Sequence, residues 1–258
     1  MNLHKWRHQF AMAATALATA VLSSISVAEA TTVLYVPQDD RPVSLAYTVA
    51  TAQDAGYTVL TPPEYFISGR NFQGNAEAIW KWVDENASKA DVLVLSTDTL
   101  IYGGLVDSRK HHLDMHTLTY RVHHIEDLHT KYPNIPIYAF GTVMRSPRAS
   151  GGGVEPSYYD QYGPTIFRIA ALQDKMDSQP LTVDEQKELF TLQATVPVEF
   201  LQDWFQRRQK NMTVNRELID ITKKGVFTYF ALGHDDTSNL SQSAMEGRYL
   251  QKHSKGLS

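Results

Sequence analysis

The sequence contains no cysteine, and this absence excludes two features. The chain cannot form disulfides, although export would permit them, and it cannot carry the acylated cysteine of a bacterial lipoprotein. It also lacks a basic excess, because 24 Lys and Arg residues stand against 28 Asp and Glu, a formal net charge of -4. A mildly acidic protein has no electrostatic signature for binding nucleic acid or an anionic membrane surface.

Long apolar runs are also missing, apart from one near the N-terminus at residues 10–22, which is short for a transmembrane helix. Two basic residues precede this run, and Ala28-Glu29-Ala30 follows it as a small-x-small cleavage site. This pattern predicts a secretory signal peptide at residues 1–30. We expect a mature protein that begins at Thr31, is periplasmic or secreted, and has no stable association with the membrane.

Metal-binding motifs are absent as well. Six histidines lie between residues 111 and 129, and His112 and His116 have i, i+4 spacing, but no HExxH or comparable ligand set occurs. Histidines on a polar helix face are usually solvated. The sequence therefore predicts no metal site there and no cofactor.

The chain instead alternates short apolar runs with amphipathic segments. Strands are predicted at 33–37, 57–63, 91–97, 135–143 and 226–232, and helices at 43–55, 75–86, 116–132, 182–195 and 197–224. The glycine- and tyrosine-rich stretch at 147–163 is predicted to be a loop. Repeated βα units predict an α/β fold with a parallel sheet and right-handed crossovers. We expect one α/β domain at 31–258, with 146–225 as a loop and helical segment inside it.

Two architectures fit this alternation: an open doubly wound sheet and an incomplete (β/α) barrel-like domain. A closed barrel needs eight βα units and typically about 250 residues. We favour the incomplete barrel-like domain, the N-terminal portion of a longer protein, because the chain ends at residue 258 without structural closure. Such a portion would leave strand edges and apolar faces uncovered.

Acidic residues follow three of the predicted strands directly. Asp39 and Asp40 come after the first, Asp98 after the third, and Asp235 and Asp236 after the fifth. Ligands bind at the carboxyl ends of parallel strands in open sheets and in barrels. The pattern therefore predicts a site where these carboxylates meet. The alternative is that each caps the helix that follows it.

Further candidates for substrate binding lie beside these carboxylates. Arg41 can hold one of the paired aspartates ionised, while repulsion raises the pKa of the other. The remaining candidates flank the glycine-rich segments and are Tyr102, Arg109, Arg145, Glu155 and Tyr159. Paired glycines would allow the backbone to approach a ligand closely, and tyrosine rings can stack on a sugar face. The alternatives are a glycine-rich turn and a surface loop held by its tyrosines.

Four segments together resemble an uncharacterised bacterial family, DUF4127. They are YVPQDDRP (35–42), STDTLIYGGLVDSR (96–109), YAFGTVMR (138–145) and LGHDD (232–236). The resemblance runs from residue 33 to the end and implies a longer protein, since family members are about twice this length. This chain has His234 where the family pattern has Gln. The family name assigns no activity.

The function that these features favour is a carbohydrate-active enzyme, a glycoside hydrolase. Such enzymes use one carboxylic acid to protonate the leaving oxygen and a second carboxylate as nucleophile or base. Asp235 and Asp236 are the candidate catalytic pair, with the other strand-end carboxylates binding hydroxyls of a glycan. Two alternatives stay open: a metal-dependent hydrolase that uses the same aspartates with His234, and a non-catalytic glycan-binding protein.

Overall fold

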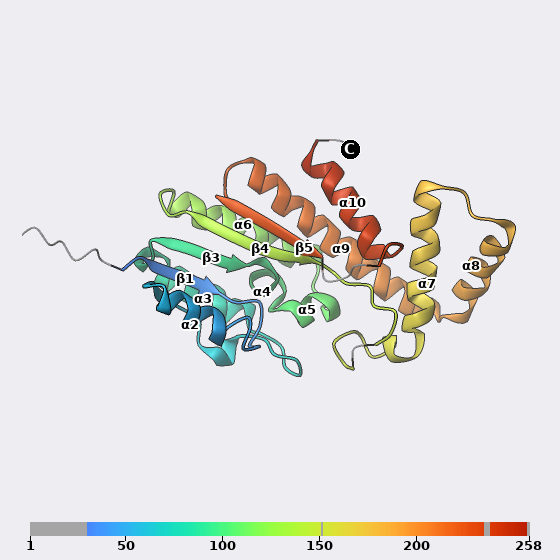
Figure 1. Cartoon of the computed structure of the whole chain (residues 1–258), viewed down its shortest axis with the longest axis horizontal. Coiled ribbons are helices and arrows are strands. Elements are labelled where there is room, and N and C mark those ends of the chain that lie inside the picture. The colour runs from blue at the N-terminus through green and yellow to red at the C-terminus, as the bar shows by residue number, and fades with distance from the viewer. Residues whose placement is uncertain (1–29, 151, 235–237, 257–258) are drawn as a thin grey trace, which may run out of the picture. The chain divides into compact units, whose positions relative to one another are not determined.

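The structure is a computed structural model in which Thr31–Ser258 form one compact unit. It describes residues 30–150, 152–234 and 238–256, and the fold below is that of this unit. Its strands are β1 (Thr32–Val36), β2 (Thr58–Leu60), β3 (Val92–Ser96), β4 (Ile137–Val143) and β5 (Tyr229–His234). They form one sheet in the order β2-β1-β3-β4-β5, and every neighbouring pair is parallel (Figure 1). The predicted α/β class with a parallel sheet is confirmed.

The strand order matters for the position of a site. β1 lies between β2 and β3, so the chain first winds outward to β2 and then crosses back past β1 to β3. This order is that of open doubly wound sheets, the other of the two architectures considered, whereas in a barrel successive strands are neighbours. Doubly wound sheets bind ligands in the crevice at the carboxyl ends where the winding reverses. That point lies between β1 and β3.

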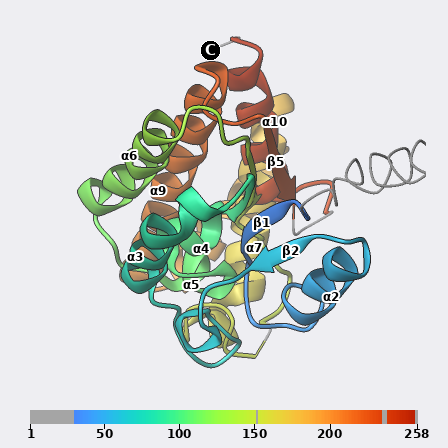
Figure 2. The ribbon, with the colours of Figure 1, turned by 90° about the vertical axis from the view of Figure 1, so that its left-hand side faces the viewer.

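Right-handed crossovers on either side of this reversal place helices on opposite faces of the sheet. Helix α2 (Ala46–Asp54) covers one face, while α3 (Ala76–Asn86), α6 (Met115–Lys131) and α9 (Val198–Lys223) pack on the other (Figure 2). The sequence of α3 explains its place. The Asn75 side chain caps its first turn, and the apolar residues at 76, 79, 80 and 83 are all buried.

The main core lies between the sheet and these three helices. Leu34, Leu93 and Leu95 project from β1 and β3 and are fully buried against residues such as Ile79 and Ile125. A second, smaller cluster joins α7 (Tyr159–Ser178), α8 (Val183–Thr195) and α9 around Trp204. Burial of apolar surface on this scale is the dominant stabilising contribution to such a fold.

Some elements differ from the sequence-based expectation. Helix α7 begins at Tyr159, inside the predicted loop, and it accommodates Pro164 near its first turns. The short helices α4 (Thr97–Tyr102) and α5 (Leu105–Lys110) replace the expected glycine-rich turn. Strand β5 begins three residues later than the apolar run, because Val226 and Phe227 pack into the core before the strand starts.

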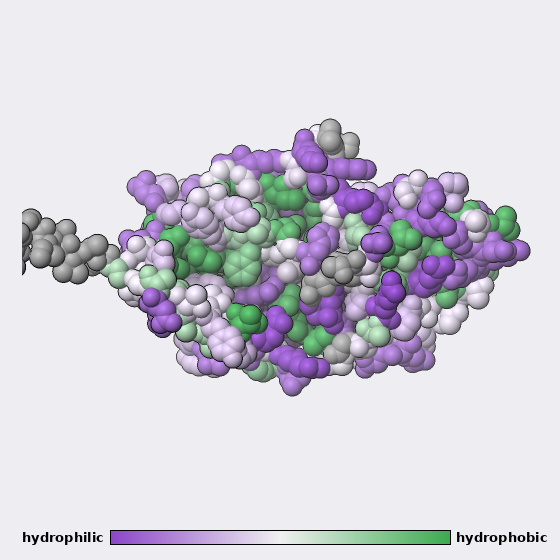
Figure 3. Space-filling view, viewed as in Figure 1, coloured by the Kyte–Doolittle hydropathy of each residue, from purple (hydrophilic) through white to green (hydrophobic). Residues whose placement is uncertain are grey.

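The face of the sheet on the α2 side is apolar and partly open. Val94, Tyr138 and Tyr229 lie opposite one another in adjacent strands, and Tyr138 and Tyr229 are exposed. Hydrophobic side chains are visible over β3 and β4 in the space-filling view (Figure 3). No helix in the described part of the chain is long and apolar enough to cross a membrane.

Candidate functional site

Polar side chains tie the carboxyl ends of β1, β3 and β4 together. The Thr99 hydroxyl donates to the Pro37 carbonyl at 2.6 Å, which joins the end of β1 to the first turn of α4. Gln38 Nε2 donates to Asp98 Oδ2 at 3.1 Å, and Thr142 Oγ1 donates to the same oxygen at 2.8 Å. Asp98 is therefore buried between the carboxyl ends of β1 and β4 and does not line the cavity at this edge.

Burial dominates the chemistry of Asp98. The residue is only 3% exposed, and loss of solvation raises the pKa of its carboxyl to about 6. The hydrogen bonds from Thr142 and Gln38 and the charge of Arg109 act in the opposite direction but do not cancel this rise. The carboxyl of Asp98 therefore takes up a proton at a higher pH than an ordinary aspartate does.

A cavity of about 300 Å³ lies at the same edge of the sheet. Five of the predicted site residues line it, and they come from three separate segments: Asp39, Asp40, Arg41, Arg109 and Arg145. Its other walls are Gly69, Arg70, Leu105, Val106 and Val154. The parallel arrangement thus gathers charged side chains that lie up to about a hundred residues apart in the sequence.

The paired aspartates have different surroundings. Asp39 is buried and accepts hydrogen bonds from the backbone N–H of Arg41 at 3.2 Å and from its Nε at 2.8 Å. Burial, and then the charge of Asp39, raise the pKa of Asp40. One carboxylate is therefore held in an ion pair while its neighbour takes up a proton more readily, as expected for adjacent carboxyl groups.

Two arginines are held in place by one carboxylate. Glu155, 2% exposed, accepts from Arg145 Nε at 2.7 Å and from its terminal nitrogen, and lies 3.9 Å from a terminal nitrogen of Arg109. Beside it, the glycine-rich loop is anchored by Arg70, which donates to the Gly152 carbonyl at 3.4 Å. The predicted residue Glu155 therefore positions the arginines rather than lining the cavity itself.

Two predicted residues lie elsewhere. Tyr102 belongs to the main core and lines a different cavity, where its ring packs against His111 at a centroid distance of 4.9 Å. Tyr159 is fully buried, donates to the Pro147 carbonyl at 2.8 Å and packs against Trp204. The structure does not bring these two rings to the cavity, because the helices that carry them direct them into hydrophobic clusters.

The paired glycines also serve packing rather than a ligand. Gly103 has φ +106° and ends α4 in the left-handed region that favours glycine. A Cβ on Gly104 would stand 1.7 Å from Ser68 Oγ, so the close approach is to the protein's own chain. Sequence reasoning missed Gln38, Thr142 and Arg70, although the position of Gln38 beside the paired aspartates was a usable signal.

The predicted catalytic pair lies at the end of β5. His234, the last residue of that strand, pairs with Val143 of β4, so β5 ends at the same edge of the sheet as β1 and β3. Asp235 and Asp236 follow it in sequence and lie outside the described residues.

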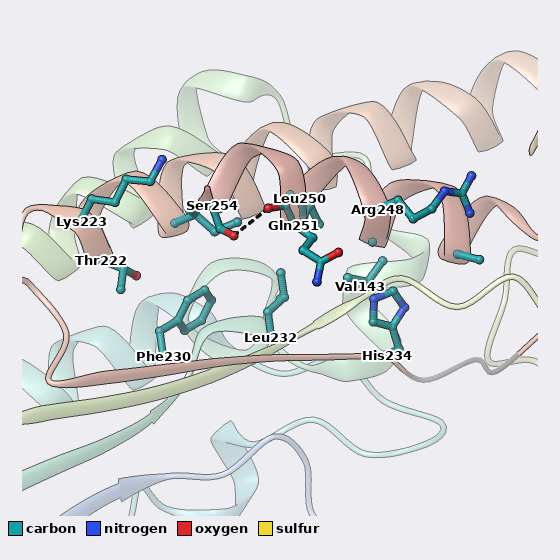
Figure 4. A pocket seen from close by; sticks show the side chains of 13 residues that line it. Val143, Thr222, Lys223, Phe230, Leu232, His234, Arg248, Leu250, Gln251 and Ser254 are labelled. Atoms are coloured by element: carbon teal, nitrogen blue, oxygen red, sulfur yellow. Dashed lines mark hydrogen bonds between the residues drawn. The ribbon is translucent and has the colours of Figure 1, made fainter. Parts of the chain in front are cut away.

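A larger cavity of about 580 Å³ lies between β5 and α10 (Gln242–Ser254) (Figure 4). The His234 ring points into this groove, where Gly247 makes room for it, since a Cβ there would lie 2.1 Å from the ring. Its walls include Phe230, Leu232 and Leu250, and none of its described lining residues carries a carboxylate. The smaller cavity is the better candidate for acid–base chemistry despite its size.

Among the described ranges, no group of three or more His, Cys, Asp or Glu side chains is placed to hold a metal ion. The candidate site is taken as the residues that line the smaller cavity together with Asp98, which is buried beside them.

We predict that Asp98 imposes a pH dependence on stability. Its pKa is about 6 in the folded protein and 3.8 when unfolded. Between these values the unfolded chain loses the proton while the folded protein keeps it, so the free energy of unfolding falls as pH rises from 4 to 6. The expected fall is about 3 kcal/mol, from about 1.4 kcal/mol per pKa unit.

Denaturant titrations of the wild type and of Asp98→Asn at several pH values test this prediction. The amide keeps an oxygen to accept from Gln38 and Thr142 but does not titrate. Burial lowers the pKa of His111 to about 4, so its contribution rises with pH over an overlapping range. This contribution is common to both proteins and cancels in their difference. A difference curve that stays flat from pH 4 to 6 would rule out the raised pKa.

The fold and the site define a class of protein. It is a doubly wound α/β protein with a cavity, lined by arginine and aspartate, near the point where the winding of the sheet reverses. The chain belongs to the family described as Protein of unknown function (DUF4127), which matches residues 33–258. No curated protein matches it. A solved structure of catalytic-site mutants of active domain 2 of chitinase from Pyrococcus furiosus is 9% identical, covers 90% of this chain and 93% of that chain, and has a TM-score of 0.21. Such a low TM-score supports no conclusion about function.

Proposed function

We propose that the protein is an exported carbohydrate-active enzyme, a glycoside hydrolase that works at the carboxyl edge of the sheet. The observation that carries the proposal is a cavity lined by two carboxyl groups at the end of β1, beside the point where the winding of the sheet reverses. Asp39 and Asp40 line the cavity there, and Gln38 links Asp98 to the same strand end. Ligand sites of doubly wound sheets lie at this position.

The protonation behaviour of these groups suits glycoside hydrolysis. The reaction breaks the bond between the anomeric carbon and the leaving oxygen, adds the OH of water to that carbon and a proton to that oxygen. One carboxyl group must therefore hold a proton near neutral pH while another stays ionised. The same edge of the sheet provides surroundings of both kinds, since burial raises the pKa of Asp98 to about 6 and Asp39 is paired with Arg41. These two residues are proposed to support the catalytic pair and are not themselves that pair.

Asp235 and Asp236 are the proposed catalytic pair on the grounds of sequence, since they directly follow β5. Asp39, Asp40 and Asp98 are proposed to bind substrate hydroxyls or to hold the partner charge of the pair. Export is proposed from residues 1–30, and N-terminal sequencing of secreted material that began at Met1 would contradict it.

The test is a hydrolysis screen of the purified full chain with p-nitrophenyl glycosides and cell-wall polysaccharides. We expect p-nitrophenol or new reducing ends, at a rate that survives EDTA. The variant Asp40→Asn should lower the rate, whereas the control Asp184→Asn, at a fully solvated helix position, should not. Absence of hydrolysis across the screen would refute the proposal. Loss of activity in EDTA with recovery in Mn²⁺ would favour a metal-dependent hydrolase instead.

A further inference from the structure

Arginine is the most frequent residue in the lining of the smaller cavity, the one near the carboxyl ends of β1 and β3. Four guanidinium groups, of Arg41, Arg70, Arg109 and Arg145, line it together with only two carboxylates, those of Asp39 and Asp40. Glu155, which pairs with Arg109 and Arg145, adds a third carboxylate, so four positive charges stand against three negative ones. The chain as a whole carries a net charge of -4, so this small positive excess is local to the cavity. A neutral sugar carries hydroxyls to be bound but no negative charge that could pair with a guanidinium group.

The arginines come from separate parts of the fold. Arg41 follows β1, Arg70 lies in the loop after the 3-10 turn Glu64–Phe66, Arg109 belongs to α5, and Arg145 follows β4. Asp39 and Glu155 offset part of the mutual repulsion of these four cations. An anion bound among them would offset more of it, and arginine forks match the geometry of carboxylate and other oxyanions.

Arg145 is oriented for such a ligand. Glu155 accepts from its Nε and from its Nη2, which fixes the plane of the guanidinium. Within the part of the chain that the structure describes, its Nη1 has no hydrogen-bond partner, and its side chain is 23% exposed at the cavity wall. The N–H groups of Nη1 are therefore available as charge-assisted donors to a ligand.

Asp40 supplies the complementary group. Its backbone N–H donates to the Ser68 carbonyl at 2.9 Å, while its carboxyl lines the cavity. A carboxyl group in this position suits the hydroxyls of a sugar. A volume of about 300 Å³ is at the lower end of small-molecule sites, so it admits a single ring rather than a long chain segment.

From this pairing we infer that the cavity selects a sugar that carries an oxyanion, namely a hexuronate whose carboxylate binds Arg145 while a hydroxyl binds Asp40. The inference rests on the proposed function for the glycan nature of the ligand and adds the acidic group. Sulfate and phosphate esters of sugars share the oxyanion chemistry and are separate arms of the test.

The experiment is isothermal titration calorimetry of the full chain with eight sugars. Six are glucuronate, galacturonate and mannuronate, each beside its neutral parent hexose, and the other two are glucose 6-sulfate and glucose 6-phosphate. At least one hexuronate should bind about 10- to 100-fold more tightly than its parent, the range expected for charge-assisted hydrogen bonds. If the sulfate or the phosphate binds more tightly than every hexuronate, the hexuronate is wrong and the oxyanion that the cavity selects is that ester.

Two variants test whether Arg145 causes the preference for the acidic sugar. Arg145→Gln should lower the affinity for the acid by a larger factor than the affinity for its parent hexose, so that the preference for the acid is lost. Arg168→Gln is the matched control, since Arg168 pairs with Glu188 away from the cavity, and it should bind like the wild type. The comparison of sugars on the wild type stands even if Arg145→Gln fails to fold. Equal affinity for every acid and its parent, or no binding of any sugar in the panel, overturns the inference.

The hydrolysis screen separates this inference from the proposed function. Hydrolysis of neutral glycosides without any preference for acidic sugars would retain the enzyme and reject the acidic ligand. A clear preference for a hexuronate without hydrolysis of any hexuronide would retain the ligand and leave a binding protein in place of the enzyme.

Discussion

Asn at position 235 or 236 is expected to lower the turnover number of the full chain by about 10²- to 10⁴-fold, the usual contribution of general acid–base catalysis. The amide keeps the size of the side chain but can neither donate an acid proton nor carry a negative charge. A coupled acidic pair should also give a bell-shaped pH–rate profile with one limb above the range of an ordinary Asp.

Stability measured on the same variants separates catalysis from helix capping. Loss of a cap by Asp235→Asn or Asp236→Asn would cost about 1 kcal/mol of unfolding free energy and leave turnover nearly intact. The account predicts the reverse pattern, with unchanged melting temperature and slow turnover. Near-wild-type turnover with a lowered melting temperature would remove Asp235 and Asp236 from the mechanism.

Arg208→Met is expected to give the largest loss of stability. Arg208 is 1% exposed and forms a two-pronged ion pair with Glu246 of α10, with N···O distances of 2.8 and 2.7 Å. It also donates to the backbone carbonyls of Met144 at 2.7 Å and Arg145 at 2.8 Å, beyond the end of β4. The variant leaves a buried carboxylate and two carbonyls without their partner. Breaking such a pair typically costs about 3–5 kcal/mol.

Denaturant unfolding of three variants tests this prediction. In Arg208→Met/Glu246→Leu the buried carboxylate is gone too, so part of the lost stability should return. Arg168→Met is the control, because its ion pair with Glu188 is about 40% exposed on both sides and should contribute at most about 1 kcal/mol. A loss below about 1 kcal/mol in Arg208→Met would mean that the pair with Glu246 does not hold α10 and the end of β4 together.

The sequence predicts most of the secondary structure because burial leaves local patterns. Apolar runs place β1, β3 and β4 within two residues of their observed ends, and the apolar residues of α3 follow helical spacing. Helix α7 was missed because Pro164 and the neighbouring glycines resemble a loop, although the chain tolerates proline early in a helix. Helices α4 and α5, of six residues each, are too short to show a period.

The site was only partly predictable, because it depends on which strands are neighbours. Strand-end carboxylates such as Asp40 and Asp98 could be named from local context, but the reversal between β1 and β3 is a property of the sheet order. The hydrogen bonds of Gln38 and Thr142 to Asp98 span 60 and 44 residues and leave no local signal. The sequence does not distinguish Tyr159, which is buried, from a tyrosine that stacks on a sugar, because the two look alike in sequence.

The most direct test of the site is the position of a bound sugar in a crystal structure. Crystals of the protein are soaked with the sugar of the panel that binds most tightly. The account predicts ligand density at the carboxyl ends of β1 and β3, with ligand oxygens in contact with Asp40 and Arg145. Density in the larger groove between β5 and α10, with none in the smaller cavity, would contradict it.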